Sequence, residues 1–144
     1  MARRRRAGFP VVVHTMLVRD NELFLLRRAH TGFMDGYYAL PGGHQHQGES
    51  VSAAARREVR EETGIDLTAV EPRCVLPYRD GVHQGLNFVF ETSAFVDEPT
   101  ICEPQLFDAC CWVPTDDLPQ PVAPWLQAVI EMPREVWYRE FHWD

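Results

Sequence analysis

The stretch between Ser50 and Gly64 most constrains the fold of this chain, because it carries both end signals of a single helix. Ser50 is a favourable N-cap residue, and Gly64 suits the left-handed position that follows the last helical turn. At about 100° per residue, Ala54 and Ala55 fall on one face, as is typical of the side that packs on a protein core. The spacing therefore predicts a helix over residues 50–63 that lies against the protein body.

Three glutamates, Glu58, Glu61 and Glu62, continue the same face into the last turn and a half of this helix. The helix macrodipole disfavours negative charge there by about 0.3–1 kcal/mol for each carboxylate, and the glutamates also repel one another. Folding alone does not require such an arrangement. A hard divalent cation with oxygen ligands would remove the repulsion, so we expect Mg²⁺ at this face, with Mn²⁺ as the alternative.

The segment that contains these glutamates resembles the Nudix box of the MutT-like Nudix hydrolase family, which reads Gly-x5-Glu-x7-Arg-Glu-U-x-Glu-Glu-x-Gly-U with U a bulky aliphatic residue. Every fixed position of the box is filled: Gly43, Glu49, Arg57, Glu58, Val59, Glu61, Glu62, Gly64 and Ile65. The resemblance implies an α/β fold, namely an α/β/α sandwich with a mixed β-sheet. It also implies a hydrolase in which water attacks a phosphorus atom with the help of a divalent metal.

The roles that the resemblance implies can be placed residue by residue. The metal ligands would be three carboxylates and one main-chain oxygen: Glu58, Glu61, Glu62 and the carbonyl of Gly43. Glu49 and Arg57 would form an ion pair that fixes the loop against the helix. Carboxylates crowded around a metal include one with a raised pKa or one displaced from ligation, so we take Glu61 as the first choice of general base and Glu62 as the second.

Other residues are candidates for substrate binding. Arg27 and Arg28 end a β-rich segment, and the resemblance implies that one of them reaches the substrate phosphates; strand alternation places at most one of the two in the site. His44 follows Gly43 and is a candidate phosphate contact. His44 and His46 also form a His-x-His pair, but the absence of a third nitrogen or sulfur ligand nearby favours polar loop residues over a zinc site.

Glu103 lies about 40 residues after the box, where some members of the family supply one more acidic ligand. The alternative is an ordinary surface charge. Asp97 and Glu98 are weaker candidates for the same role, and Gln105 stands where an acid might equally have been.

Length and charge limit how the chain can be organised. With 144 residues, we expect a flexible basic arm over residues 1–8 and a single domain over residues 9–144. The four arginines from Arg3 to Arg6 are interpreted as a solvated arm in preference to a nucleic-acid contact or a targeting signal. The net charge is −7 even with this arm included, so the acidic body should repel long nucleic acid.

The sequence predicts no membrane span and no secretory signal, so we expect a cytoplasmic protein. The four cysteines have no Cys-x-x-Cys spacing and are interpreted as buried reduced thiols. The oligomeric state stays open, with a homodimer as the possibility that the resemblance raises.

Hydrophobic periodicity and turn residues predict the remaining elements. Residues 9–18 and 22–28 are expected to form a hairpin, and residues 41–43 a turn into the box. The other predicted elements are strands at residues 37–40, 67–78, 86–96 and 110–113, and a second helix at residues 121–132. The aromatic residues of segment 136–143 are interpreted as packing residues in preference to a platform for a nucleobase.

These patterns favour a Mg²⁺-dependent pyrophosphohydrolase that cleaves the diphosphate bond of a nucleoside di- or triphosphate, or of a nucleoside diphosphate linked to another group. The alternative is a nucleotide-sensing domain that keeps the fold and binds without hydrolysis. A diphosphate isomerase is a further alternative, since a fold does not determine a function. The sequence does not select the substrate.

Overall fold

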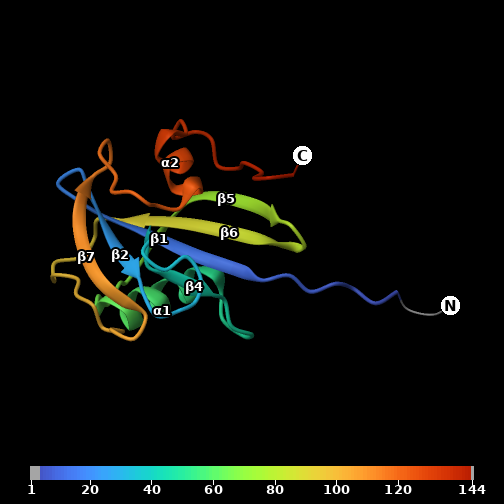
Figure 1. Cartoon of the computed structure of the whole chain (residues 1–144), viewed down its shortest axis with the longest axis horizontal. Helices are drawn as coiled ribbons and strands as arrows, with labels where there is room; N and C mark the ends of the chain where they lie inside the picture. Colours follow the sequence, from blue (N-terminus) through green and yellow to red (C-terminus); the bar gives the residue numbers. More distant parts are fainter. Residues whose placement is uncertain (1–3, 144) are drawn as a thin grey trace.

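The computed structural model describes residues 4–143 (Figure 1). Within them, the elements follow the order β1 Val11–Arg19, β2 Glu22–Arg28, β3 Tyr38–Ala39, β4 Gly42–His44, α1 Val51–Thr63, β5 Glu71–Asp80, β6 His83–Thr92, β7 Phe107–Pro114 and α2 Pro124–Glu131.

Within residues 4–143, seven strands form one mixed sheet in which β1 is the central strand. The main path runs β3-β2-β1-β6-β5, while β4 pairs with β1 and β7 pairs with β2. The β1–β6 pair is parallel, from Val11 opposite Leu86 to Leu17 opposite Thr92, and the other strand pairs are antiparallel. The short strand β4 joins β1 with Gly43 opposite Val13, which places the start of the box on the central strand.

The two helices cover opposite faces of the sheet (Figure 1). Ala54, Ala55 and Val59 are buried on the α1 side, in clusters that include residues of β1 and β6. Leu126 and Val129 of α2 are fully buried on the other side. The expected α/β/α sandwich with a mixed sheet is thus confirmed.

Several local predictions are also confirmed. Asp20 and Asn21 form the tight turn of the first hairpin, and both adopt positive φ angles of 53° and 63°. Helix α1 is capped as expected: the Ser50 side chain accepts a hydrogen bond from the Ala53 N–H, and Gly64 is left-handed with φ 80°. Asp and Asn tolerate the positive φ angles of the hairpin turn, and glycine adopts the left-handed conformation at the end of α1 without a steric cost.

Other boundaries differ from the predictions for identifiable reasons. Residues 42–44 form strand β4, where a turn was expected, because they pair with β1. Helix α2 begins at Pro124, three residues later than predicted. The residues before it pair with β3 instead: the Pro121 carbonyl accepts a hydrogen bond from the Tyr38 N–H, and Val122 forms a β-bridge with Tyr38. Strands β5 and β6 are also shifted relative to residues 67–78 and 86–96, because they pair around the turn at Gly81.

The segment after α2 runs along the outer edge of β5 (Figure 1). The Val75 N–H donates to the Trp137 carbonyl at 2.7 Å, and the Phe141 N–H donates to the Pro77 carbonyl at 2.9 Å. Phe141 is partly buried against the α2-side core, whereas 66% of Trp137 remains exposed. Main-chain pairing and the packing of Phe141 therefore hold this segment on the domain.

The burial expected for the cysteines is wrong for three of the four. All are free thiols, but only Cys74 is buried; Cys102 and Cys110 are exposed and Cys111 is half-buried. Two of them, Cys110 and Cys111, lie on β7, which pairs with β2 at the border of the sheet. Arg4 to Gly8 of the expected arm are exposed and form no regular element, while Arg3 lies outside the described residues. In the described part of the chain, no helix has the length and apolar character needed to cross a membrane.

Candidate functional site

The end of helix α1 meets strand β4, and this junction brings the box residues together. The cap at Gly64 closes the helix with a hydrogen bond of 2.9 Å from its N–H to the Arg60 carbonyl. Glu58, Glu61 and Glu62 are therefore held in the last turns by the helix itself. The apolar half of the same face is buried, so the carboxylates lie beside the sheet and not on the far side of the helix.

Glu62 is the most buried carboxylate of this group, with only 4% of its surface exposed. Its Oε2 accepts a hydrogen bond of 3.1 Å from the Gly42 N–H. Burial raises the pKa of Glu62 well above its ordinary value, and the neighbouring charge of Glu58 raises the pKa further. An ionised Glu62 therefore needs more positive charge than the Gly42 amide supplies.

Gly43 lies directly against Glu58. A Cβ atom at position 43 would be 2.5 Å from Oε1 of Glu58, so only glycine fits there while Glu58 keeps this position. Gly42 is restricted more strictly, because its Cβ would lie 2.1 Å from the carbonyl oxygen of Val13, which belongs to the backbone of β1. The Gly-Gly pair thus allows the backbone of β4 to pass between β1 and the carboxylates.

Arg57 connects the loop before the helix to the carboxylates. It forms two hydrogen bonds with Glu49, Nε to Oε2 at 3.0 Å and Nη2 to Oε1 at 2.8 Å, which confirms the expected ion pair. Its Nη1 donates to Glu58 at 2.9 Å and to Glu61 at 3.2 Å, and Nη2 also donates to the His44 carbonyl at 2.9 Å. One guanidinium therefore fixes the position of the loop relative to the helix.

The Arg57 hydrogen bonds lower the pKa of Glu49 to about 2, with help from the His46 N–H, which donates to the same carboxylate at 2.8 Å. The same hydrogen bonds, which Arg57 donates to Glu49, raise the pKa of Arg57. Both groups are charged at neutral pH, so the pair neutralises itself and leaves the charges of the other glutamates largely uncompensated.

Glu103 lies close enough to the helix end to interact with its charges. Burial raises the pKa of Glu103, and the charges of Glu61 and Glu58 raise it further. The Cys102 N–H donates to the Glu62 carbonyl at 3.0 Å, which ties this loop to α1. The weaker candidate Glu98 lies elsewhere, paired with Arg19 at 2.7 Å.

The structure does not bring the two candidate arginines into contact with the glutamates. Arg27 forms an ion pair with Asp108 at 2.7 Å, and the Nε of Arg28 donates to the Phe33 carbonyl at 3.0 Å. Arg27 thus joins β2 to β7, whereas Arg28, which also donates to the Thr31 hydroxyl at 3.3 Å, contacts the loop over residues 29–37.

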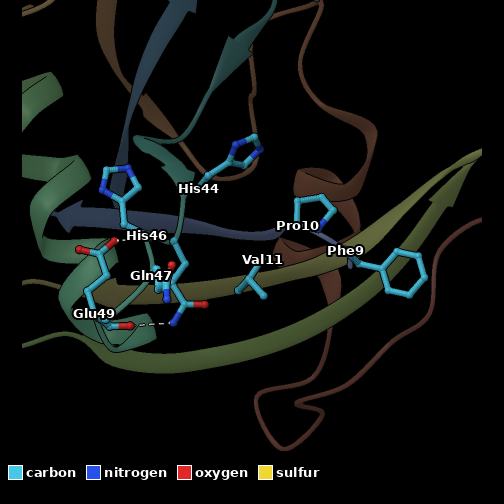
Figure 2. A pocket seen from close by; sticks show the side chains of 9 residues that line it. Phe9, Pro10, Val11, His44, His46, Gln47 and Glu49 are labelled. Carbon is cyan, nitrogen blue, oxygen red and sulfur yellow. Dashed lines mark hydrogen bonds between the residues drawn. The ribbon is translucent and has the colours of Figure 1, made fainter. Parts of the chain in front are cut away.

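Within residues 4–143, no group of three or more His, Cys, Asp or Glu side chains is arranged as a ready-made metal cage. The described contacts explain this: Arg57 holds Glu58 and Glu61, and Gly42 holds one oxygen of Glu62. His44 and His46 are exposed in the loop that enters α1 (Figure 2), so their interpretation as polar loop residues stays a prediction.

Sequence reasoning missed a polar contact behind β4. The Nε2 atom of His14 lies 2.9 Å from Oδ1 of Asn87, and the His14 ring centroid is 4.4 Å from that of Trp125. Burial lowers the pKa of His14 to about 4, although the hydrogen bond with Asn87 opposes this shift. These three residues come from β1, β6 and α2, so no local spacing in the sequence signals their contact.

Comparisons with known proteins agree with this geometry. The NUDIX domain model matches residues 8–132. The nucleoside triphosphatase NudI of Klebsiella pneumoniae is 36% identical over 116 residues, which cover 71% of this chain and 80% of that protein. A crystal structure of the MutT NUDIX hydrolase from Burkholderia pseudomallei superposes with a TM-score of 0.80 and 31% identity, covering 87% of this chain and 98% of that one.

The ADP-ribose pyrophosphatase of Methanocaldococcus jannaschii is 42% identical over 55 residues, which cover 38% of this chain. The chain spans less than two thirds of the first curated relatives that it matches: 32% of this archaeal protein and 60% of a nucleoside triphosphatase NudI from an Enterobacter strain.

Proposed function

This chain belongs to the Nudix family, and from this premise we propose that it hydrolyses a phosphoanhydride bond in a nucleotide or a nucleoside diphosphate derivative, with Mg²⁺ as the metal and Mn²⁺ as the alternative. One observation carries the proposal: the end of α1 gathers Glu58, Glu61 and the buried Glu62 beside Gly43. Burial, with a further contribution from the neighbouring carboxylates, raises the pKa of Glu62 and of Glu103. Relatives named for nucleoside triphosphates and ADP-ribose support nucleotides as the substrate class.

The donor chemistry of this junction fits a hard divalent cation. Its side chains offer only carboxylate oxygens, and their mutual repulsion would be relieved by positive charge. The groups that would hold the ion are Glu58, Glu61, Glu62, Glu103 and the carbonyl of Gly43. Because Arg57 holds Glu58 and Glu61, these two side chains must exchange its hydrogen bonds for the cation.

A bound divalent metal supplies two kinds of chemistry here, acidification of water and neutralisation of the diphosphate oxygens. In the hydrolysis, the water oxygen forms a bond to phosphorus while the bond from phosphorus to the bridging oxygen breaks, and the leaving phosphate keeps that electron pair. A carboxylate accepts the water proton. We assign this role first to Glu61, whose side chain is 44% exposed and accessible to water, and second to the buried Glu62.

Arg57 and Glu49 act as positioning residues in this proposal. They hold the loop over residues 44–49 against α1 through the hydrogen bonds described above, and through them the position of Glu58. Arg27, Arg28 and His44 remain predicted phosphate contacts. The homodimer also remains a prediction, which sedimentation of the purified chain would check.

The test is turnover of a panel of nucleotides with Mg²⁺, read as release of phosphate and of nucleoside monophosphate. We expect Glu61→Gln to reduce turnover by about 10²–10⁴-fold without a change in melting temperature. Glu71→Gln, which changes an exposed carboxylate of β5, serves as the matched control. Normal turnover in Glu61→Gln would exclude the assigned role, and tight nucleotide binding without any product across the panel would indicate a sensing domain.

A further inference from the structure

The outer edge of β7 is open to a further strand. In the described part of the chain, β7 pairs with β2 alone and lies at one end of the sheet (Figure 1). Within residues 4–143, the main-chain groups of residues 109–113 that point away from β2 have no hydrogen-bond partner. Such an edge can accept another strand, because its N–H and C=O groups are otherwise left to water.

The features that protect a strand edge are confined to the two ends of β7. The register with β2 shifts at Asp108, which forms a bulge, and the charge of Asp108 is paired with Arg27 at 2.7 Å. Pro114 is the last residue of the strand. Between these two residues the sequence Ala-Cys-Cys-Trp-Val contains no charge and no proline. Residues 109–113 therefore lack the charges and prolines that usually prevent edge-to-edge pairing.

The side chains of β7 hold this edge in an extended form. Trp112 packs on the α1 side of the sheet, where its ring centroid lies 5.5 Å from that of Phe24. Cys111 and Val113 pack on the α2 side. Because both faces are anchored, a strand added at the edge would meet a preformed partner, which lowers the entropic cost of association.

The sequence of this edge is complementary to itself in an antiparallel arrangement. If Cys111 lies opposite Cys111 of a second copy, all five residues from 109 to 113 are paired. Residues directly opposite each other lie on the same face of a sheet, so Trp112 would face the thiol of Cys110, a favourable contact between sulfur and an aromatic ring. Asp108 would face Pro114, so no like charges are opposed. This self-complementarity favours a second copy of the chain over an unrelated peptide.

We propose that β7 pairs antiparallel with β7 of a second copy of this chain, in the register centred on Cys111. The proposal does not depend on the proposed hydrolysis, because none of the α1 carboxylates lies on β7. It identifies the surface and the register of a homodimer. Five residue pairs form a small interface, so we expect weak association that depends on concentration.

Sedimentation of the purified, reduced chain over a series of concentrations tests the association. We expect the weight-average mass to rise from that of one copy toward that of two. Cys110→Lys should weaken the dimer by about tenfold, because it places two lysines close together across the new pairing. Cys110 is exposed, so the melting temperature should stay unchanged. Cys102→Lys is the matched control, since Cys102 is an exposed thiol outside β7 and should leave the association unchanged.

Cross-linking tests the register. In the proposed dimer the two Cys110 residues are diagonal neighbours on one face, about 7–8 Å apart, within reach of bis(maleimido)ethane. We expect this reagent to give a covalent dimer with the wild type and with Cys102→Ser, but not with Cys110→Ser. Amide hydrogen exchange gives a readout without any substitution: exchange within residues 109–113 should slow as the concentration rises.

Three results would overturn the proposal. The first is the mass of a single copy at every concentration. The second is a dimer that Cys110→Lys leaves intact and that Cys110 does not cross-link, because its contact would lie elsewhere. The third is unchanged exchange within residues 109–113 at a concentration where the mass has doubled. Each result leaves the proposed hydrolysis untouched, since turnover is measured separately.

Discussion

Gly43 and Glu58 lie so close together that a single methyl group added to the glycine would clash with the glutamate: a Cβ on Gly43 would lie 2.5 Å from Oε1 of Glu58. The Glu58 side chain is held by Arg57 and is only 12% exposed, so it has little freedom to move away. The glycine at the start of the box is therefore a steric requirement of the carboxylate that follows it 15 residues later.

Gly43→Ala should displace Glu58 and reduce Mg²⁺-dependent turnover by about 10²-fold, because small misplacements of a reacting group have effects of this size. Overpacking should also reduce the free energy of unfolding by about 1–3 kcal/mol. Turnover and urea unfolding measure the two effects. Gly8→Ala is the control, since a Cβ there meets nothing within 4 Å. Full activity in Gly43→Ala would show that Glu58 does not need its present position.

The sequence predicted the fold class, α1 with both caps, and the Glu49–Arg57 ion pair, because each depends on local spacing or on a box of fixed residues. It did not predict β4, since the pairing of Gly43 with Val13 depends on a strand 30 residues earlier. The contact between His14 and Asn87 was not predicted from the sequence for the same reason, because it joins side chains that are 73 residues apart.

Glu49→Gln should flatten the acid dependence of stability. The pKa of Glu49 in the folded protein is about 2, below its ordinary value of 4.5, because Arg57 donates to it. Its stabilising contribution is therefore present above pH 4.5 and is lost as the pH falls from 4.5 toward 2. Urea unfolding at a series of pH values checks this, with Glu135→Gln as an exposed control. Parallel curves for wild type and Glu49→Gln in this window would contradict the assigned pKa.

His14→Gln should act at higher pH. The pKa of His14 is lowered from 6.5 to about 4, so the unfolded chain binds a proton in this interval that the folded protein does not. The contribution of neutral His14 is complete above pH 6.5 and is lost as the pH falls toward 4. We expect His14→Gln to reduce this loss by on the order of 2 kcal/mol, less than the full shift implies because the residue is only half-buried. His83→Gln, at the exposed start of β6, should leave the pH dependence of stability as in the wild type. A wild-type pH dependence in His14→Gln would refute the assigned pKa.

Arg73 offers a test of the α2 side of the domain. It is only 6% exposed, and its guanidinium donates to the carbonyls of Val136 at 2.9 Å, Met132 at 2.8 Å and Val129 at 3.3 Å, at and just beyond the end of α2. Arg73→Met should lower the free energy of unfolding by about 2–3 kcal/mol, because it leaves buried carbonyls without donors. Thermal unfolding measures the loss, and Arg60→Met provides a control on the exposed face of α1. A change below 0.5 kcal/mol, about the size expected for a surface substitution, would show that these hydrogen bonds do not stabilise the fold.

The segment along β5 has a consequence for association between molecules. An unpaired strand at the edge of a sheet is a template for intermolecular sheet growth. In this chain, main-chain groups of Trp137 and Phe141 already form hydrogen bonds with main-chain groups of β5. Two copies of this chain therefore cannot merge their sheets through β5 unless the C-terminal segment first peels away, and the chain carries its own barrier to fibre-like polymerisation along this border.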